Sequence, residues 1–437
     1  MTGWGVATSA FQIEGAPDAE GRGRSTWDEF CERPGAIRDG TDARVACDSY
    51  HRGADDLALL QTLGVDAYRF SVAWPRIQPD GSGSVNAAGL DHYERLVDSL
   101  LAKGIRPFPT LFHWDLPLAL EQAGGWPSRD TALRFVDYAL AVTERLGDRV
   151  KVWATHNEPW CTAMLGHAAG VFAPGHRDPS AAYDAAHHLL LSHALAARAI
   201  AEIQPELEVG IVLNLTVVRA EPGGEPLAVE VVDAWQNRLW LDALREGSYP
   251  AVLGSPRALR DGDLDTIRGS TAWLGVNYYT PFRIGPAAAD TDAVGQDVDA
   301  FPGAPVFSFA PRAPLTTMGW EVDATGLAET LRNTAKALPG VPLRVTENGA
   351  AFADQSLEDE DRISYLREHL AALAEVQSEG LDVRDYFAWS LLDNFEWAQG
   401  YTQTFGLVAV EPGSLRRVPK ASFAWYAEHI ARSRLGP

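Results

Sequence analysis

The sequence is short of cysteine and of long apolar runs. Its 437 residues include 3 cysteines, Cys31, Cys47 and Cys161, too few and odd in number for a disulfide framework. We therefore expect a reducing, cytoplasmic setting. No apolar stretch reaches the ~18 residues of a membrane-spanning helix. Residues 1–10 also lack the basic and apolar parts of a secretory signal, so we expect neither membrane insertion nor export.

Basic residues are also scarce. The chain has 37 Lys and Arg against 59 Asp and Glu, a net charge of -22. Such a surface repels phosphate backbones and anionic membranes, which argues against nucleic-acid and membrane partners. Aromatic residues, in contrast, are plentiful, with 14 Trp and 12 Tyr. Their flat amphipathic faces suit stacking on sugar rings as well as the filling of a large core.

Short apolar runs bounded by Gly or Pro alternate along the chain with amphipathic stretches of helical period. Most runs are almost continuously apolar, which is typical of parallel strands covered on both faces. The predicted strands are Gly5–Phe11, Val65–Val72, Ile105–Phe112, Val150–His156, Glu208–Leu215, Trp273–Tyr279, Leu343–Thr346 and Asp385–Trp389. The predicted helices include Ala54–Leu63, Leu90–Lys103, Thr131–Leu146 and Pro179–Ile203.

This alternation predicts the fold class. Eight strands alternating with helices over 437 residues favour an α/β fold, a single (β/α)8 TIM barrel with enlarged βα loops, over a doubly wound sheet. We expect one domain spanning residues 1–437. The segment Gly285–Pro314, rich in Ala, Asp, Gly and Pro, is predicted to be a long surface loop after the sixth strand.

Polar residues close nearly every predicted strand. Active sites on this fold lie at the carboxyl ends of the strands, so these residues are the candidates for chemistry. Loop polarity explains any one of them but not the whole ring. The ring comprises Gln12, Glu14, Arg69, His113, Asp115, Asn157, Glu158, Asn214, Asn277, Tyr279, Glu347, Asn348, Trp389, Asp393, Glu396 and Trp397.

Two carboxylates stand out in this ring. Glu158 lies in Thr155-His-Asn-Glu-Pro159 and Glu347 in Thr346-Glu-Asn-Gly349, each expected one residue beyond its strand. On the fourth and seventh strands they would face each other across the barrel mouth. Paired carboxylates that flank a bond suit glycoside hydrolysis, in which one protonates the leaving oxygen and the other attacks the anomeric carbon.

Metal binding is the competing use of acids at a barrel mouth, and His113, His156 and His167 are the candidate ligands. No histidine pair with metal-ligand spacing stands next to either glutamate, so no metal or other cofactor is predicted. The histidines of the helix Pro179–Ile203, which are His187, His188 and His193, are predicted to form a wet face. A Gly-rich phosphate loop and the Gly-x-Ser-x-Gly motif of serine hydrolases are both absent from the sequence.

Read together and in order, the strand-end segments resemble the family 1 glycoside hydrolases, the β-glucosidase family. The resemblance runs essentially end to end. It rests on Gln12-Ile-Glu-Gly15, Tyr68-Arg-Phe-Ser71, His113-Trp-Asp-Leu-Pro117, Asn157-Glu-Pro159, Asn277-Tyr-Tyr-Thr280, Thr346-Glu-Asn-Gly349, Trp389-Ser-Leu-Leu-Asp-Asn-Phe-Glu-Trp397 and Phe405-Gly-Leu407.

The resemblance implies roles for single residues. Glu158 would be the acid/base and Glu347 the nucleophile, with Arg69, Asn277 and Tyr279 around the nucleophile. The residues implied to hold the glycone hydroxyls are Gln12, His113, Asn157, Glu396 and Trp397. Trp389 would be the platform beneath the ring, and Trp320 the aglycone-side tryptophan. Leu165 and Phe172 are expected to line the same subsite, because they follow the fourth strand on the side from which a leaving group must depart. The chain departs from the family at Thr404, where a basic residue commonly precedes the aromatic.

The residues also give a physical reason for two of these roles. A cation at Arg69 would lower the pKa of Glu347 and keep it ionised, whereas Glu158 beside that charge would hold its proton. We expect a cytoplasmic retaining β-glycosidase, most readily a β-glucosidase that acts on cello-oligosaccharides or on aryl and alkyl glucosides. A transglycosidase and a catalytically retired sugar-binding protein on the same scaffold are the alternatives.

Overall fold

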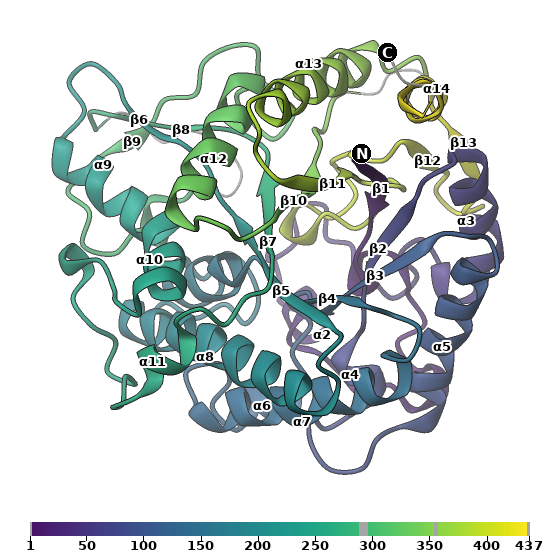
Figure 1. Ribbon diagram of the computed structural model, residues 1–437, viewed down its shortest axis with the longest axis horizontal. Helices are drawn as coiled ribbons and strands as arrows, with labels where there is room; N and C mark the ends of the chain where they lie inside the picture. Colours follow the sequence, from purple (N-terminus) through teal and green to yellow (C-terminus); the bar gives the residue numbers. More distant parts are fainter. Residues whose placement is uncertain (1, 288–295, 354–356, 435–437) are drawn as a thin grey trace.

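Eight parallel strands close into a barrel in the computed structural model (Figure 1). The structure describes residues 2–287, 296–353 and 357–434. In order around the barrel, the strands are β1 (Gly3–Ala7), β11 (Val383–Trp389), β10 (Leu343–Asn348), β7 (Leu274–Tyr278), β5 (Glu208–Asn214), β4 (Val152–Asn157), β3 (Arg106–Phe112) and β2 (Ala67–Ser71). Each predicted strand corresponds to one of them, so the predicted barrel is confirmed.

Helices surround the barrel in a closed ring, in which each contacts the next and the last returns to the first. In ring order they are α3 (Ser49–Leu63), α5 (Ala87–Leu101), α7 (Arg129–Leu146), α8 (Pro179–Ile203), α11 (Asp263–Ile267), α10 (Leu239–Glu246), α12 (Ala324–Ala337), α13 (Glu360–Ser378) and α14 (Ala421–Ser433). The four helices named from the sequence are all present. No helix in the described part of the chain is long and apolar enough to cross a membrane.

The remaining elements belong to the connections between strands and helices. The short helices are α1 (Ala10–Ile13), α2 (Thr26–Cys31), α4 (Trp74–Ile77), α6 (Leu118–Gln122), α9 (Pro226–Asp233), η1 (Ala19–Gly21), η2 (Cys161–Ala169), η3 (Ala234–Arg238), η4 (Ala251–Leu253), η5 (Val298–Ala300) and η6 (Trp397–Gln399). The short strands are β6 (Val218–Ala220), β8 (Phe282–Gly285), β9 (Ser308–Phe309), β12 (Val408–Val410) and β13 (Arg417–Pro419).

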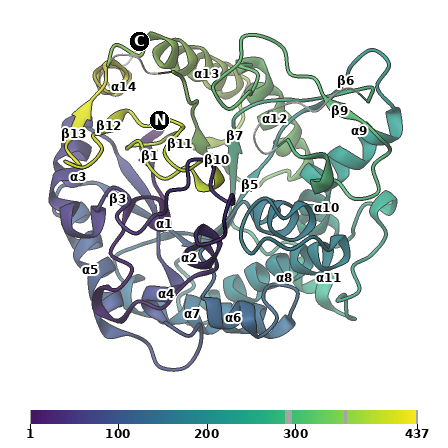
Figure 2. The same ribbon diagram turned by 180° about the vertical axis from the view of Figure 1, so that it is seen from behind.

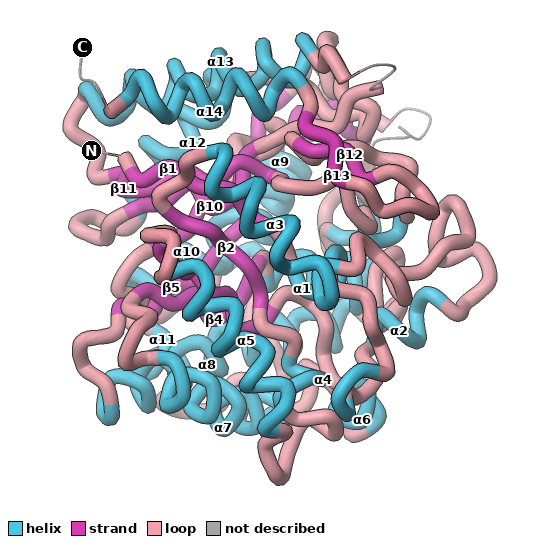
Figure 3. Tube along the Cα trace, turned by 90° about the vertical axis from the view of Figure 1, so that its right-hand side faces the viewer, coloured by secondary structure: helices cyan, strands magenta, loops and turns pink. Residues whose placement is uncertain are grey.

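One end of the barrel carries the long loops. Figure 2 shows the N-terminal segment with α2 crossing this face, and Figure 3 shows α1, α2 and the β12–β13 pair at the end opposite to the two termini. Because all eight strands are parallel, their carboxyl ends meet here, and so do the polar residues that close them.

Side chains fill the barrel interior below this end. Phe108, Trp273 and Phe387 form an aromatic layer among small residues of the facing strands. A Cβ at Gly210 would lie 2.4 Å from the Trp273 ring, so only glycine leaves room for this indole. The guanidinium of Arg344 lies over Phe108 and Trp273 and pairs with Asp385. The packed interior gives the site above it a rigid floor.

Two element predictions need correction. The first strand ends at Ala7 rather than Phe11, because the Ala10 amide donates to Ser71 Oγ and the chain turns into α1. The predicted loop 285–314 contains η5 and β9, and β9 pairs with β8, which pairs with β6, in a small sheet. Residues 288–295 of that predicted loop lie outside the described part of the chain.

The predicted wet face of α8 is wrong. His187, His188 and His193 are all buried, because α8 packs on β4 and β5 of the barrel, on its ring neighbours α7 and α11, and on η2. Each ring has a polar partner. His187 lies 3.0 Å from Asp263 Oδ2, His188 lies 3.0 Å from the Trp126 carbonyl, and His193 lies 2.8 Å from Thr155 Oγ1.

Candidate active site

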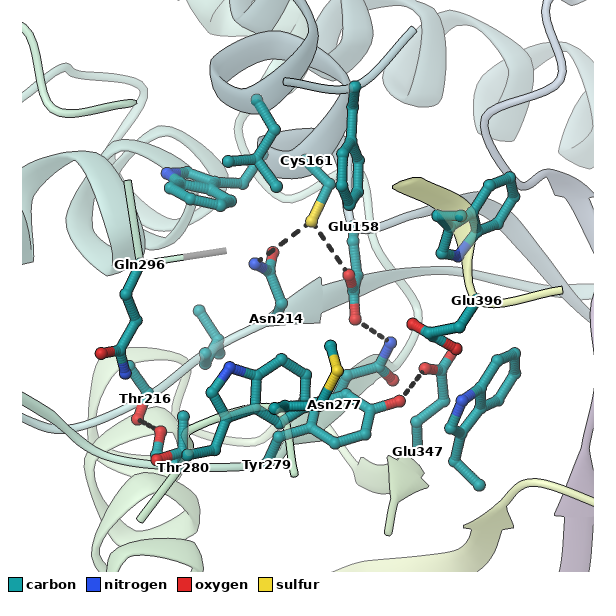
Figure 4. A pocket seen from close by; sticks show the side chains of 18 of the residues that line it. Glu158, Cys161, Asn214, Thr216, Asn277, Tyr279, Thr280, Gln296, Glu347 and Glu396 are labelled. Carbon is teal, nitrogen blue, oxygen red and sulfur yellow. Dashed lines mark hydrogen bonds between the residues drawn. The ribbon is translucent and has the colours of Figure 1, made fainter. Parts of the chain in front are cut away.

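A cavity of about 900 Å³, its open entrance included, lies at the carboxyl end of the strands (Figure 4). Most of the site residues predicted from the sequence line it. These are His113, Glu158, Asn277, Tyr279, Trp320, Glu347, Trp389, Glu396 and Trp397, together with Leu165 and Phe172. Gln12, Arg69 and Asn157 are buried behind this wall and contact residues that line the cavity.

Glu347 reaches the cavity from within β10, not from one residue beyond its strand as predicted. The register of β10 against β7 shifts between Val345 and Glu347. Such an irregularity redirects side chains. The carboxylate accepts two short hydrogen bonds, one from Arg69 Nη1 at 2.5 Å to Oε1 and one from the Tyr279 hydroxyl at 2.5 Å to Oε2.

Glu158 follows β4 directly, as predicted. Its backbone has φ 45°, a left-handed conformation that costs a residue with a side chain about 1–3 kcal/mol and is typical of functional sites. Asn277 Nδ2 donates to its Oε1 at 2.7 Å, and the Cys161 thiol donates to its Oε2 at 3.1 Å (Figure 4). Neither donor carries a charge.

The two carboxyl groups differ in how they hold a proton. Burial, and then the charge of Glu347, raise the pKa of Glu158 to about 8. Burial also raises the pKa of Glu347, against the hydrogen bonds and charge of Arg69 and the hydrogen bond of Tyr279. The expectation that Arg69 leaves this pKa low therefore overlooked burial. Since charge-assisted hydrogen bonds stabilise only the anion at Glu347, a single proton shared by the pair lies on Glu158.

Asn277 links the two carboxyl groups to a buried amide network. Asn277 Nδ2 donates to Asn157 Oδ1 at 3.0 Å as well as to Glu158. Asn277 Oδ1 accepts a hydrogen bond from Thr346 Oγ1 at 2.7 Å. Arg69 Nη2 reaches the same Asn157 oxygen at 2.7 Å. Strands β2, β4, β7 and β10 thus hold the carboxyl groups through side chains with fixed partners, and such preorganisation supports catalysis.

A third carboxyl group, Glu396, faces this pair from the loop after β11. Burial, followed by the charges of Glu347 and Glu158, raises its pKa to about 8. Gln12 holds it from behind, with Nε2 at 3.4 Å from Oε2 and at 3.0 Å from the Phe395 carbonyl. The Gln12 amide thus has protein partners and positions Glu396.

His113 lines the cavity and holds a buried ring nitrogen without a partner in the described part of the chain. Asn157 Nδ2 donates to its Nε2 at 3.0 Å, so the ring proton lies on Nδ1, which has no partner among the described residues. Burial, and then Arg69, lower its pKa well below the usual range, so the ring is neutral. It lies nearly parallel to Trp389 and Trp397, at ring distances of 6.0 and 5.9 Å.

The rest of the cavity wall is mostly aromatic. Trp320 lies 5.3 Å from Tyr279 and 6.0 Å from Phe405 between ring centres. Further apolar lining comes from Trp160, Leu165, Phe172 and Phe282. The side-chain oxygens of Gln236 and Gln296 are buried here without a partner among the described residues. Aromatic faces and such acceptors together suit an amphipathic group.

The sequence-based prediction missed several lining residues. Gln236 and Gln296 lie far from any strand end, in η3 and just before η5, so no local pattern marks them. Cys161 lies three residues after Glu158 where the chain turns helical, a spacing that brings side chains together and could have identified it. The described residues contain no group of three or more His, Cys, Asp and Glu arranged to hold a metal ion.

Comparison with known proteins gives one consistent picture. The sequence model of the family described as "Glycosyl hydrolase family 1" matches residues 3–435. The chain is 46% identical over 444 residues to "Thermostable beta-glucosidase B" of Thermobispora bispora, covering 99% of this chain and 90% of that protein. It is 43% identical over 436 residues to "Beta-glucosidase" of Agrobacterium sp., covering 97% and 93%.

Solved structures agree. The psychrophilic beta-glucosidase BglU from Micrococcus antarcticus has a TM-score of 0.93 and 42% identity, covering 99% of this chain and 97% of that one. The beta-glucosidase from Thermotoga maritima in complex with deoxynojirimycin has a TM-score of 0.90 and 39% identity, covering 98% and 97%.

Proposed function

The chain belongs to glycosyl hydrolase family 1, and we propose that Glu158 and Glu347 carry out a two-step β-glucosidase reaction. The protein is a retaining glycoside hydrolase. The observation that supports the assignment is the unequal environment of the two carboxyl groups. Glu347 accepts from Arg69 and Tyr279, whereas the donors to Glu158 among the described residues are an amide and a thiol.

In the first step, a Glu347 oxygen attacks the anomeric carbon of a terminal β-glucosyl residue. The bond from that carbon to the leaving oxygen breaks, and Glu158 gives its proton to this oxygen. In the second step, the Glu158 carboxylate takes a proton from water. The water oxygen then bonds to the anomeric carbon and the ester to Glu347 breaks, so the β-configuration is restored.

The remaining assignments belong to the same proposal. His113, Glu396 and Trp397 contact the glycone, and Trp389 lies beneath it. Gln12 and Asn157 hold the glycone-binding side chains in place or contact the sugar directly. Trp320 borders the aglycone. We take residues 1–437 as one catalytic domain that acts on cellobiose-like or aryl glucosides without a cofactor. The free thiols of Cys31, Cys47 and Cys161 support a cytoplasmic location.

The roles of the two glutamates are tested with substitutions and azide. Glu158→Gln should lose about 10²–10⁴ in rate on cellobiose, the usual contribution of a general acid. It should still form the intermediate quickly from a dinitrophenyl glucoside, because that leaving group needs no proton. Azide needs no general base, so it should restore turnover and yield the β-glucosyl azide.

The matched variant is Glu347→Ala, in which azide enters from the vacated face and should give the α-glucosyl azide. The anomeric configuration is read by NMR. If the two configurations are interchanged, Glu158 is the nucleophile and the assignment reverses. A parent protein that binds glucose but hydrolyses no aryl β-glucoside would be a sugar-binding protein. Product transfer to an added alcohol in preference to water would identify a transglycosidase.

A further inference from the structure

Cys161 is a buried thiol in the active-site wall that the two-step reaction leaves without a role. Its Sγ–H donates to Glu158 Oε2 at 3.1 Å, and Asn214 Nδ2 lies 3.7 Å from the same sulfur (Figure 4). An amide donor on the sulfur lone pair directs the S–H bond toward the carboxyl group. The thiol therefore connects the end of β5 to Glu158.

The backbone fixes the thiol relative to this carboxyl group. The Cys161 amide donates to the Glu158 carbonyl at 2.9 Å where η2 begins. On the other side, Gln236 Nε2 donates to the Asn214 carbonyl at 2.5 Å. Both partners of the thiol are thus anchored by bonds that do not involve the substrate.

The two oxygens of Glu158 have different donors. Oε1 accepts from the Asn277 amide, whereas the only donor to Oε2 in the described part of the chain is the thiol. A protonated Glu158 therefore carries its proton on Oε2. A thiol is a weak donor and a weak acceptor, so this oxygen can leave the sulfur for a leaving group at little cost and still gain a hydrogen bond when it is ionised.

We infer that Cys161 is a positioning residue that stabilises the ionised form of Glu158 through its S–H···O hydrogen bond and releases Oε2 when the carboxyl group is protonated. The inference rests on the proposed role of Glu158 as acid/base. The balance between protonated and ionised Glu158 would then depend on Cys161, a side chain that makes no proposed contact with the sugar.

Other groups also act on the proton of Glu158. Glu347 from β10 and Glu396 from the loop after β11 oppose its ionisation, while Arg69 from β2 and Asn277 from β7 favour it. The Tyr279 hydroxyl, which follows β7, faces the same pair and stays protonated. Substitution of Cys161 leaves all of these groups in place, so a change in the titration of Glu158 isolates the effect of the thiol.

The test compares Cys161→Ser and Cys161→Ala through the pH profile of kcat/KM on an aryl β-glucoside. The alkaline limb reports the acid of the free enzyme. A hydroxyl is a stronger donor to the carboxylate, so the serine variant should move this limb down by about half a pH unit to one unit. Alanine removes the donor, so the limb should move up by a similar amount.

Cys31 is a thiol on α2 outside the cavity. Cys31→Ser is therefore the matched control and should leave the pH profile of kcat/KM unchanged. Thermal unfolding checks that each variant is folded, and Cys161→Val replaces the alanine variant if the smaller side chain prevents folding. Opposite shifts support the inference, since a packing role cannot produce them. Coincident profiles, or shifts in the same direction, overturn it. A parent enzyme without activity on any aryl glucoside would instead contradict the proposed function.

Discussion

At the scale of single residues, the site is governed by which donors face which carboxyl group. The Tyr279 hydroxyl donates to Glu347 Oε2 at 2.5 Å and opposes the effect of burial on that group's pKa. Its own pKa is raised well above the usual range, first by burial and then by Glu347, so it remains a donor over the working range of pH. Loss of the Tyr279 hydroxyl should therefore shift the titration of Glu347.

We expect Tyr279→Phe to raise the pKa of Glu347, because the carboxylate loses a donor. Below this pKa the nucleophile is protonated and inactive, so the acidic limb of kcat/KM should move to higher pH, by about one unit. Tyr401→Phe is the control, since that hydroxyl donates to the Asp42 carbonyl and Tyr401 is not among the residues that line the cavity. An acidic limb that stays in place would mean that Tyr279 does not stabilise the ionised nucleophile.

Trp320 is expected to contribute to binding of the aglycone. Its ring packs beside Tyr279 and Phe405 at the proposed aglycone end of the cavity. Trp320→Ala should raise the KM of aryl glucosides by about 3- to 10-fold, the value of a lost aromatic contact. Inhibition by free glucose should remain nearly unchanged. Steady-state kinetics with glucose as inhibitor make the comparison, and weakened glucose inhibition would place Trp320 in the glycone pocket instead.

At the scale of elements, a partly buried ion pair and a hydrogen bond tie the outer helices together. Asp263 at the start of α11 accepts from Arg129 of α7 at 2.8 and 2.6 Å and lies 3.0 Å from His187 Nε2 of α8. Burial alone would raise the pKa of Asp263, but the hydrogen bonds from Arg129 and His187 lower it to about 2. One carboxylate therefore joins three helices of the ring.

We expect Asp263→Asn to lower the free energy of unfolding by about 2–3 kcal/mol at neutral pH. An aspartate in the unfolded chain titrates near pH 4, so the stabilisation is complete above that pH. It is lost as pH falls toward the folded-state pKa of about 2. Urea unfolding followed by tryptophan fluorescence at several pH values measures both effects, with Asp265→Asn as the exposed control on the same helix. A difference between variant and parent that persists undiminished at pH 2 would contradict this account.

Strand order could be predicted from the sequence, whereas contacts between elements distant along the chain could not. Parallel strands force their carboxyl ends to one side of the barrel, so Glu158, Glu347 and Asn277 could be brought together from strand order alone. The turn into α1 depends on a hydrogen bond to Ser71, and the burial of α8 depends on helices distant in sequence. Histidines on α8 are polar by composition, yet each finds a partner that only the tertiary structure provides.

The loop after β11 also depends on contacts that the local sequence does not reveal. Thr404 stands where the resemblance to the family led us to expect a basic residue. Arg362 of α13 donates from Nη2 to the Thr404 carbonyl at 2.5 Å, and Thr404 Oγ1 donates to the Phe352 carbonyl at 2.8 Å. A cation from another element thus reaches the loop that the local sequence leaves without one. The loop carries Phe405, which lines the cavity.

At the scale of the whole molecule, the two ends of the chain close the barrel. The first strand, β1, pairs with the last, β11, and with β2. The C-terminal helix α14 packs on α3 and α13, and its Tyr426 hydroxyl donates to the Gly5 carbonyl in β1 at 3.0 Å. The barrel therefore cannot close without β1 and β11. Unfolding of α14 should open the barrel and with it the site at the carboxyl ends of the strands.

We expect Tyr426→Ala to lower the free energy of unfolding by about 3–5 kcal/mol, because the ring is fully buried and leaves a cavity. Tyr426→Phe loses only the hydrogen bond, at about 1 kcal/mol. Activity and tryptophan fluorescence should be lost at the same denaturant concentration in both variants, since β1 belongs to the same closed sheet as Glu347. Arg432→Ala, an exposed position on α14, should leave the midpoint unchanged. If activity outlasts the fluorescence change in Tyr426→Ala, α14 unfolds separately and the site does not depend on closure at this end.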